Sequence, residues 1–156
     1  MKITPSRSGN RALRRGRCSE PGRIYFLTTV TERRQPWFAA FDTVCRVARL
    51  HLDPSNFAGA RCLAWVLMPD HWHGLIELAE GQELARVMQR FKSRSGYEVG
   101  QALGRSGRIW QPGYHDHALR ADEDVRRAAR YLVANPIRAG LADSVGGYPF
   151  WDAVWL

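Results

Sequence analysis

The fold of this chain is decided by the stretch Cys62-Leu63-Ala64-Trp65-Val66-Leu67-Met68-Pro69-Asp70-His71-Trp72-His73-Gly74-Leu75-Ile76-Glu77-Leu78. It contains two apolar runs of strand length, and Pro69-Asp70 separates them. Because these two residues interrupt regular structure and leave only a short connection, the stretch predicts an antiparallel β-hairpin. Side chains alternate between the faces of a strand, so His71 and His73 share one face while Trp72 points the opposite way, into a core.

The segments that flank the hairpin supply further strands and helices. A run of β-branched and aromatic residues predicts a strand at 24–31. Asp42 is the expected N-cap of a helix. The expected buried positions of that helix are Val44, Val47, Ala48 and Leu50. After the hairpin, apolar residues recur at helical spacing from Glu83 onward. A glycine-rich break is then expected at Gly100, Gly104 and Gly107.

The C-terminal third adds a short strand at 115–120 and a helix that opens at Asp122-Glu123-Asp124 and runs to Asn135-Pro136. The complete order is strand, helix, strand, strand, helix, strand, helix. This order predicts an α+β fold, with a four-stranded antiparallel sheet of ferredoxin-like type and helices on one face.

Length and composition fit one folded domain that is preceded by a basic arm. The 156 residues with 45% hydrophobic content are enough to form a core. Residues 1–22 hold six basic residues against Glu20, so we expect a flexible arm there and a single domain at 23–156. No stretch approaches the roughly 18–20 apolar residues of a membrane span. We therefore expect a soluble, cytoplasmic protein associated with the nucleoid.

The cations of this chain are almost all arginines. The formal net charge is +8, and Lys2 and Lys92 are the only lysines. Arginine pairs with phosphate through two parallel hydrogen bonds, which favours a phosphate polymer as partner over a merely solvated surface. The candidate DNA-binding residues are Arg14, Arg15, Arg17, Arg86, Arg90, Lys92, Arg94, Arg120, Arg127 and Arg130.

Two small groups of side chains could perform chemistry. His71 and His73 on one sheet face could hold a divalent cation, or they could make ordinary hydrogen bonds. Tyr131 and Asn135 are four residues apart on the last predicted helix and share a side away from its apolar stripe. Tyr131 could be a nucleophile or a packing residue, and Asn135 could bind a metal or end the helix before Pro136. The spacing alone leaves these alternatives open.

Taken together, these stretches resemble a known family. Residues 64–73 resemble the HUH strand of single-tyrosine transposases, in which U is a hydrophobic residue, here Trp72. Residues 130–141 resemble the catalytic helix of those enzymes. Trp110, residues 114–120 and Tyr148-Pro149-Phe150-Trp151 match in the same order. From Arg23 to the C-terminus the chain is most similar to the REP-associated tyrosine transposases, bacterial relatives of insertion-sequence transposases.

The resemblance implies a fold, a site and a reaction. The HUH motif would lie on a central strand, and His71, His73 and Asn135 would bind one divalent cation, Mg²⁺ or Mn²⁺. Tyr131 would cleave single-stranded DNA beside hairpins of repetitive extragenic palindromes (REP) and form a 5′-phosphotyrosine. A phenol ionises with a pKa of about 10, so such a nucleophile needs activation, by the metal or by Arg127. The departures from the family pattern are Asp70, where many relatives have Asn, and the short side chain of Asn135.

Other readings remain beside this one. The chain could be a non-catalytic nucleic-acid-binding protein or a repressor derived from a transposase. It could also be a hydrolase in which His115 and His117 complete a metal site that activates water. The related enzymes include dimers that exchange the tyrosine helix, so the sequence allows a monomer or a homodimer.

Overall fold

The computed structural model describes residues 22–120 and 123–155. Nearly all of the predicted basic arm, including Arg14, Arg15 and Arg17, lies outside the described residues. The main elements are, in order, β1 (Ile24–Val30), α2 (Phe41–Arg49), β2 (Arg61–Met68), β3 (His71–Glu77), α3 (Leu84–Leu103), β4 (His115–Ala118), α4 (Val125–Val133), α5 (Asn135–Arg138) and β5 (Trp151–Ala153). Short 3₁₀ turns complete the set: η1 (Glu32–Arg34), η2 (Trp37–Ala39), η3 (Leu50–Leu52), η4 (Pro54–Phe57) and η5 (Val145–Gly147).

The strands form one antiparallel sheet in the order β4-β1-β3-β2-β5. The predicted hairpin is confirmed, since β2 pairs with β3 and Met68 lies opposite His71 at the closed end. The first four strands have the ferredoxin-like order, with the histidine strand β3 in the centre. The sheet has five strands rather than the predicted four, because β5 pairs with the outer side of β2.

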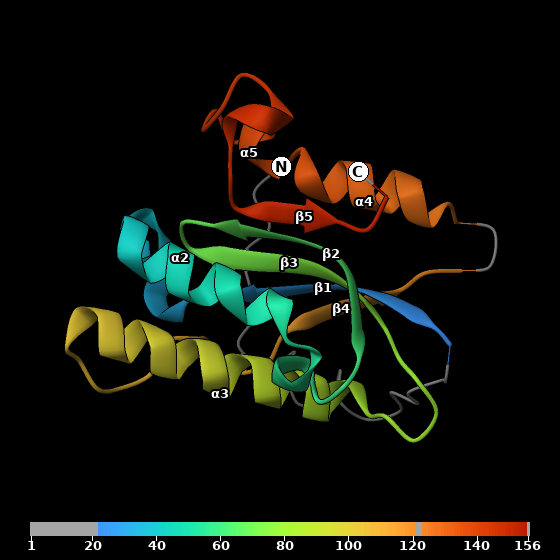
Figure 1. The fold of residues 1–156 in the computed structure, drawn as a ribbon, viewed down its shortest axis with the longest axis horizontal. Coiled ribbons are helices and arrows are strands. Elements are labelled where there is room, and N and C mark those ends of the chain that lie inside the picture. Colours follow the sequence, from blue (N-terminus) through green and yellow to red (C-terminus); the bar gives the residue numbers. More distant parts are fainter. Residues whose placement is uncertain (1–21, 121–122, 156) are drawn as a thin grey trace.

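Helices cover both faces of this sheet, which corrects the prediction of helices on one face (Figure 1). On the side of α2 and α3, the sheet contributes Trp65, Leu67, Trp72 and Ile76 to a core. On the opposite side, Ala64, Val66, Met68 and Leu75 pack with Leu132 and Val133 of α4. β2 is apolar on both faces, as strands buried in the middle of a sheet are, so each face requires a covering layer.

Several helix ends differ from the expected positions. α2 starts at Phe41 with Ala40 as N-cap, and the carboxylate of Asp42 accepts a hydrogen bond from Arg46 instead of capping the helix. α3 runs through Gly100 and ends at Leu103, where Gly104 adopts the left-handed conformation (φ 60°) that suits a glycine after a helix. The predicted break at Gly100 was therefore wrong.

Trp72 connects the histidine strand to the core of the opposite layer. Its side chain is fully buried, and its indole N–H donates to Nε2 of His51 at 3.0 Å. The other ring nitrogen of His51 lies 3.0 Å from the Ala48 carbonyl, and the ring stacks on Trp65. Burial lowers the pKa of His51 to about 3, so the imidazole is neutral and accepts the indole proton.

This arrangement predicts a loss of stability in mild acid. An unfolded histidine takes up a proton near pH 6.5, whereas folded His51 resists protonation down to about pH 3. The free energy of unfolding should therefore fall as the pH decreases below about 6.5, by up to about 1.4 kcal/mol per pH unit for this group. We expect the variant His51→Gln, whose amide oxygen can still accept from Trp72, to show a flatter profile. Urea unfolding across this pH range measures both slopes, and identical slopes would exclude His51 as the cause.

Candidate functional site

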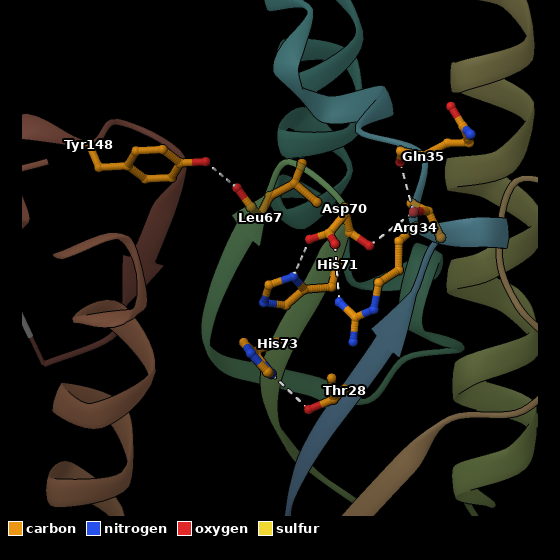
Figure 2. A network of polar contacts seen from close by, with 9 residues as sticks. Thr28, Arg34, Gln35, Leu67, Asp70, His71, His73 and Tyr148 are labelled. Carbon is orange, nitrogen blue, oxygen red and sulfur yellow. Dashed lines mark hydrogen bonds and ion pairs between the residues drawn. The ribbon is translucent and has the colours of Figure 1, made fainter. Parts of the chain in front are cut away.

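His71 and His73 lie on the face of β3 that is covered by α4, as the strand alternation predicted. Their ring centroids are 4.8 Å apart. Each Nδ1 atom is engaged by a neighbour, that of His71 by Asp70 Oδ1 at 2.6 Å and that of His73 by Thr28 Oγ1 at 2.7 Å (Figure 2). The Nε2 atoms are thus the ring nitrogens left to bind a ligand.

The electrostatics of the pair suit metal binding. Burial is the main cause that lowers the pKa of His73 to about 3; electrostatic interactions with His71 and Arg138 act in the same direction, and a hydrogen bond with the Leu27 backbone opposes them. His73 is therefore neutral near pH 7, which is the form in which imidazole binds metals. Partial burial raises the pKa of Asp70, but hydrogen bonds with His71 and Arg34 outweigh it and lower the pKa overall, so Asp70 is a carboxylate that accepts from His71.

Tyr131 lies above the same face of the sheet. Ala129, Leu132 and Val133 bury the apolar side of α4, while the side chain of Tyr131 is 59% exposed. Its ring lies 6.4 Å from Phe26, and Phe26 lies 5.5 Å from His73, measured between centroids. The structure therefore places Tyr131 and His73 near the same phenylalanine ring of one chain.

Arg138 is a site residue that the sequence reasoning missed. Its guanidinium stacks over the ring of Tyr131 at 3.9 Å and donates to the Tyr131 carbonyl oxygen at 2.6 Å. Its charge also acts on His73. No helical spacing rule connects residues 131 and 138, because α4 ends at Val133 and Arg138 belongs to α5. The sequence analysis names Arg127 instead, one turn before the tyrosine.

The sequence predicted that the helix of Tyr131 runs to Asn135, but in the structure Asn135 is not part of that helix. α4 ends at Val133, and Asn135 opens the short helix α5, with Pro136 in its first turn. Pro136 has no N–H to donate and cannot continue the hydrogen-bond ladder of α4. The side-chain N–H of Asn135 donates to the Leu132 carbonyl at 2.8 Å, which leaves the amide oxygen as its ligand atom. Its role as third metal ligand remains a prediction.

The second histidine pair does not complete a metal site. His115 and His117 lie on β4, and β1 separates that strand from β3. Nε2 of His117 lies 3.1 Å from Glu123. Across residues 22–120 and 123–155, no group of three His, Cys, Asp or Glu side chains could hold a metal. A third ligand from this chain would have to be another type of side chain, such as the amide of Asn135.

The predicted DNA-binding cations separate into two groups. Arg120, Arg127 and Arg130 are exposed on or just before α4, in the layer of Tyr131. The row Arg86, Arg90 and Arg94 is on α3, in the layer on the opposite face of the sheet (Figure 1). Within that row, Arg90 donates to the Ser55 carbonyl and Arg94 to Asn56, both in η4. Lys92 donates to the Gln111 and Gly113 carbonyls, so it holds the loop before β4.

The family model described as "Transposase IS200 like" matches residues 23–135, which hold β1 to α4 and both histidines. The chain belongs to the IS200-like transposase family. A REP-associated tyrosine transposase of Escherichia coli (strain K12) is 31% identical over 88 residues, which are 56% of this chain and 50% of that protein. The match thus spans about half the length of that relative.

The fold of this chain also matches that of a solved structure. The structure of a REP-associated tyrosine transposase bound to a REP hairpin has a TM-score of 0.67 and 25% identity, and the match covers 86% of this chain and 79% of that chain. The resemblance expected from the sequence motifs is confirmed. Within the described ranges, no helix of this chain is both long and apolar enough to cross a membrane.

Two adjacent threonines of β1 provide a test of the site. Thr28 is bonded to His73, whereas the hydroxyl of Thr29, which is buried on the opposite face, has no hydrogen-bond partner in the described structure. Replacing threonine by valine preserves the β-branched shape. We expect Thr28→Val to cost about 1–3 kcal/mol because it removes the hydroxyl partner of His73 Nδ1, and Thr29→Val to be neutral or stabilising. Chemical denaturation measures both, and equal effects would contradict the importance of the Thr28 bond.

Proposed function

We propose that this protein is a metal-dependent, single-strand DNA cleavage and joining enzyme that acts beside REP-type hairpins with Tyr131 as nucleophile. One observation supports the proposal: Tyr131, exposed on α4, and His73 both lie near the ring of Phe26, and the Nε2 atoms of His73 and its neighbour His71 remain available. Membership of the transposase family supports a DNA-processing role.

The chemistry assigned to Tyr131 is a transesterification. Its phenolic oxygen loses a proton to solvent and attacks the scissile phosphorus. A bond forms between that oxygen and phosphorus, while the bond from phosphorus to the 3′ oxygen breaks. The 3′ oxygen leaves with the electron pair and takes up a proton, which yields a 5′-phosphotyrosine and a free 3′-OH. That hydroxyl can attack the phosphotyrosine, so strands can be joined without nucleotide hydrolysis.

His71, His73 and Asn135 are the residues that would hold the divalent cation. Two imidazoles and an amide oxygen form a donor set better suited to Mn²⁺ than to Mg²⁺, which prefers oxygen ligands. When bound, the cation would supply Lewis-acid neutralisation of a phosphate oxygen. Arg138 would hold the ring of Tyr131 in place and add positive charge where the phosphate approaches.

The surface around α4 supports a path for single-stranded DNA. A cavity of about 200 Å³ is lined by Arg126, Ala129 and Arg130 of α4 and by Trp155. Arginine and tryptophan side chains together can pair with phosphates and stack on unpaired bases. The solved relative is a transposase bound to a REP hairpin, which favours hairpin DNA as the substrate here. The α3 arginines lie on the far face and are not part of this path.

The active form is proposed to be a monomer. Tyr131 and His73 both contact Phe26 of the same chain, so one copy can assemble the site without exchanging α4 with a partner.

The variant Tyr131→Phe tests the reaction. It removes the attacking oxygen while preserving the ring, which packs near Phe26 and beneath Arg138. With labelled single-stranded DNA that carries a REP-type hairpin, and with Mn²⁺ or Mg²⁺, the wild type should form a covalent protein–DNA adduct on a denaturing gel. The variant should form none, and its affinity for the same DNA should be within a few-fold of the wild type.

Different outcomes point to different functions. Cleavage that persists in Tyr131→Phe would indicate attack by water and would refute the tyrosine mechanism. Tight binding without any cleavage by the wild type would support a repressor derived from a transposase. Tyr97→Phe is the matched control, because Tyr97 is equally exposed (60%) but lies on α3.

A further inference from the structure

Beside His71, the turn of the β2–β3 hairpin is hydrogen-bonded to the segment that follows β1, which is far from it in sequence. The backbone N–H of Thr31 donates to the Asp70 carbonyl at 2.9 Å, and the Thr31 hydroxyl lies 3.0 Å from the same oxygen. The N–H of Phe38 donates to the Pro69 carbonyl at 3.0 Å. The turn of the hairpin is thus held by the segment that follows β1, which leaves Asp70 little freedom to move.

The η1 turn also contacts the hairpin turn through a side chain, that of Arg34, which pairs with Asp70. Arg33 and Arg34 both have φ of 53°, a left-handed conformation that costs non-glycine residues of the order of 1–3 kcal/mol each. This unusual turn directs Arg34 toward Asp70, and Arg34 Nη1 lies 3.1 Å from Asp70 Oδ2. Strained backbone of this kind persists only where the surroundings hold it, and it concentrates at functional sites.

The carboxylate of Asp70 divides its two oxygens between two partners. Oδ2 binds Arg34, and Oδ1 lies 2.6 Å from Nδ1 of His71 (Figure 2). A carboxylate can only accept, so Nδ1 of His71 must carry the proton whenever the ring is neutral. The lone pair of His71 is then on Nε2. A neutral histidine in water favours the opposite tautomer, in which Nε2 carries the proton. In that tautomer Nε2 has no free lone pair and cannot bind a metal.

We infer that Asp70, anchored by Arg34, is a positioning residue that sets the tautomer and orientation of His71 and so prepares Nε2 for the cation. This inference rests on the metal site of the proposed function. Partners of this kind behind metal-binding histidines typically change metal affinity by about 10–100-fold. Asp70 does not contact the cation in this scheme. It acts through His71.

The first experiment needs no metal. Full-length protein with ¹⁵N-labelled histidine reports the tautomer of each ring by NMR, at a pH well above the ordinary imidazole value of about 6.5. The His71 signals are assigned with His71→Gln. We expect the Nδ1–H form in the wild type and a shift toward Nε2–H in Asp70→Ala, with a smaller shift in Arg34→Ala. Arg33→Ala is the matched control, since residue 33 has the same left-handed backbone, and it should leave the tautomer unchanged.

The second experiment measures Mn²⁺ binding by electron paramagnetic resonance. We expect Asp70→Ala to weaken binding about 10–100-fold. Asp70→Asn should have a smaller effect, because its amide oxygen can still accept from His71 while its N–H₂ group faces the donors of Arg34. Asp70→Asn is also close in shape to the wild type, so it keeps the test usable if Asp70→Ala fails to fold.

The outcomes separate this inference from the proposed function. An unchanged His71 tautomer in folded Asp70→Ala, or unchanged Mn²⁺ affinity in every folded variant of Asp70, would overturn the role of Asp70. If the wild type and His71→Ala both fail to bind Mn²⁺, the metal site itself fails, while the metal-free tautomer result still decides whether Asp70 sets the state of His71.

Discussion

The alternation of side chains along β3 is the constraint on which the rest of the structure depends. Trp72 is fully buried on one face, and His71 and His73 emerge on the other. The Trp72 ring covers Gly74, where an added Cβ would lie 2.2 Å from it. A slip of one residue in the pairing of β3 would move the indole toward α4 and both imidazoles into the core. The packing of Trp72 thus fixes the position of the candidate site.

The sequence predicted those features that depend on local periodicity. The hairpin, the faces of His71 and Trp72, and the exposed side of α4 follow from spacings of two and of three to four residues. Features that depend on distant partners were not predicted. β5 forms only because its residues pair with β2, and α4 crosses to the second face because β2 is apolar on both sides. The helix break before Asn135 depends on competition between local signals.

The candidate site shows the same division. His71, His73 and Tyr131 could be named because the motifs that hold them resemble those of a known family, whereas their spacing alone left their roles open. The residues that support them come from turns and neighbouring strands: Thr28 from β1, Arg34 from η1 and Arg138 from α5. Their contacts span between 7 and 45 positions in the chain. A single sequence contains no spacing rule that connects such positions, so only the folded chain reveals them.

The two histidines and Tyr131 come from different layers of the fold: the histidines from the sheet, where they are held rigidly, and Tyr131 from α4, where it is exposed to solvent. The histidines lie on the central strand, and each Nδ1 is held by a separate element, Asp70 in the hairpin turn and Thr28 on β1. Tyr131 lies in the outer layer, exposed and restrained by Arg138. Ligands of a cation need fixed geometry, whereas a nucleophile must meet a phosphate that arrives from solvent. Packing α4 onto the histidine face would meet both needs of the proposed function, because its apolar side covers the sheet while its polar side stays open to solvent.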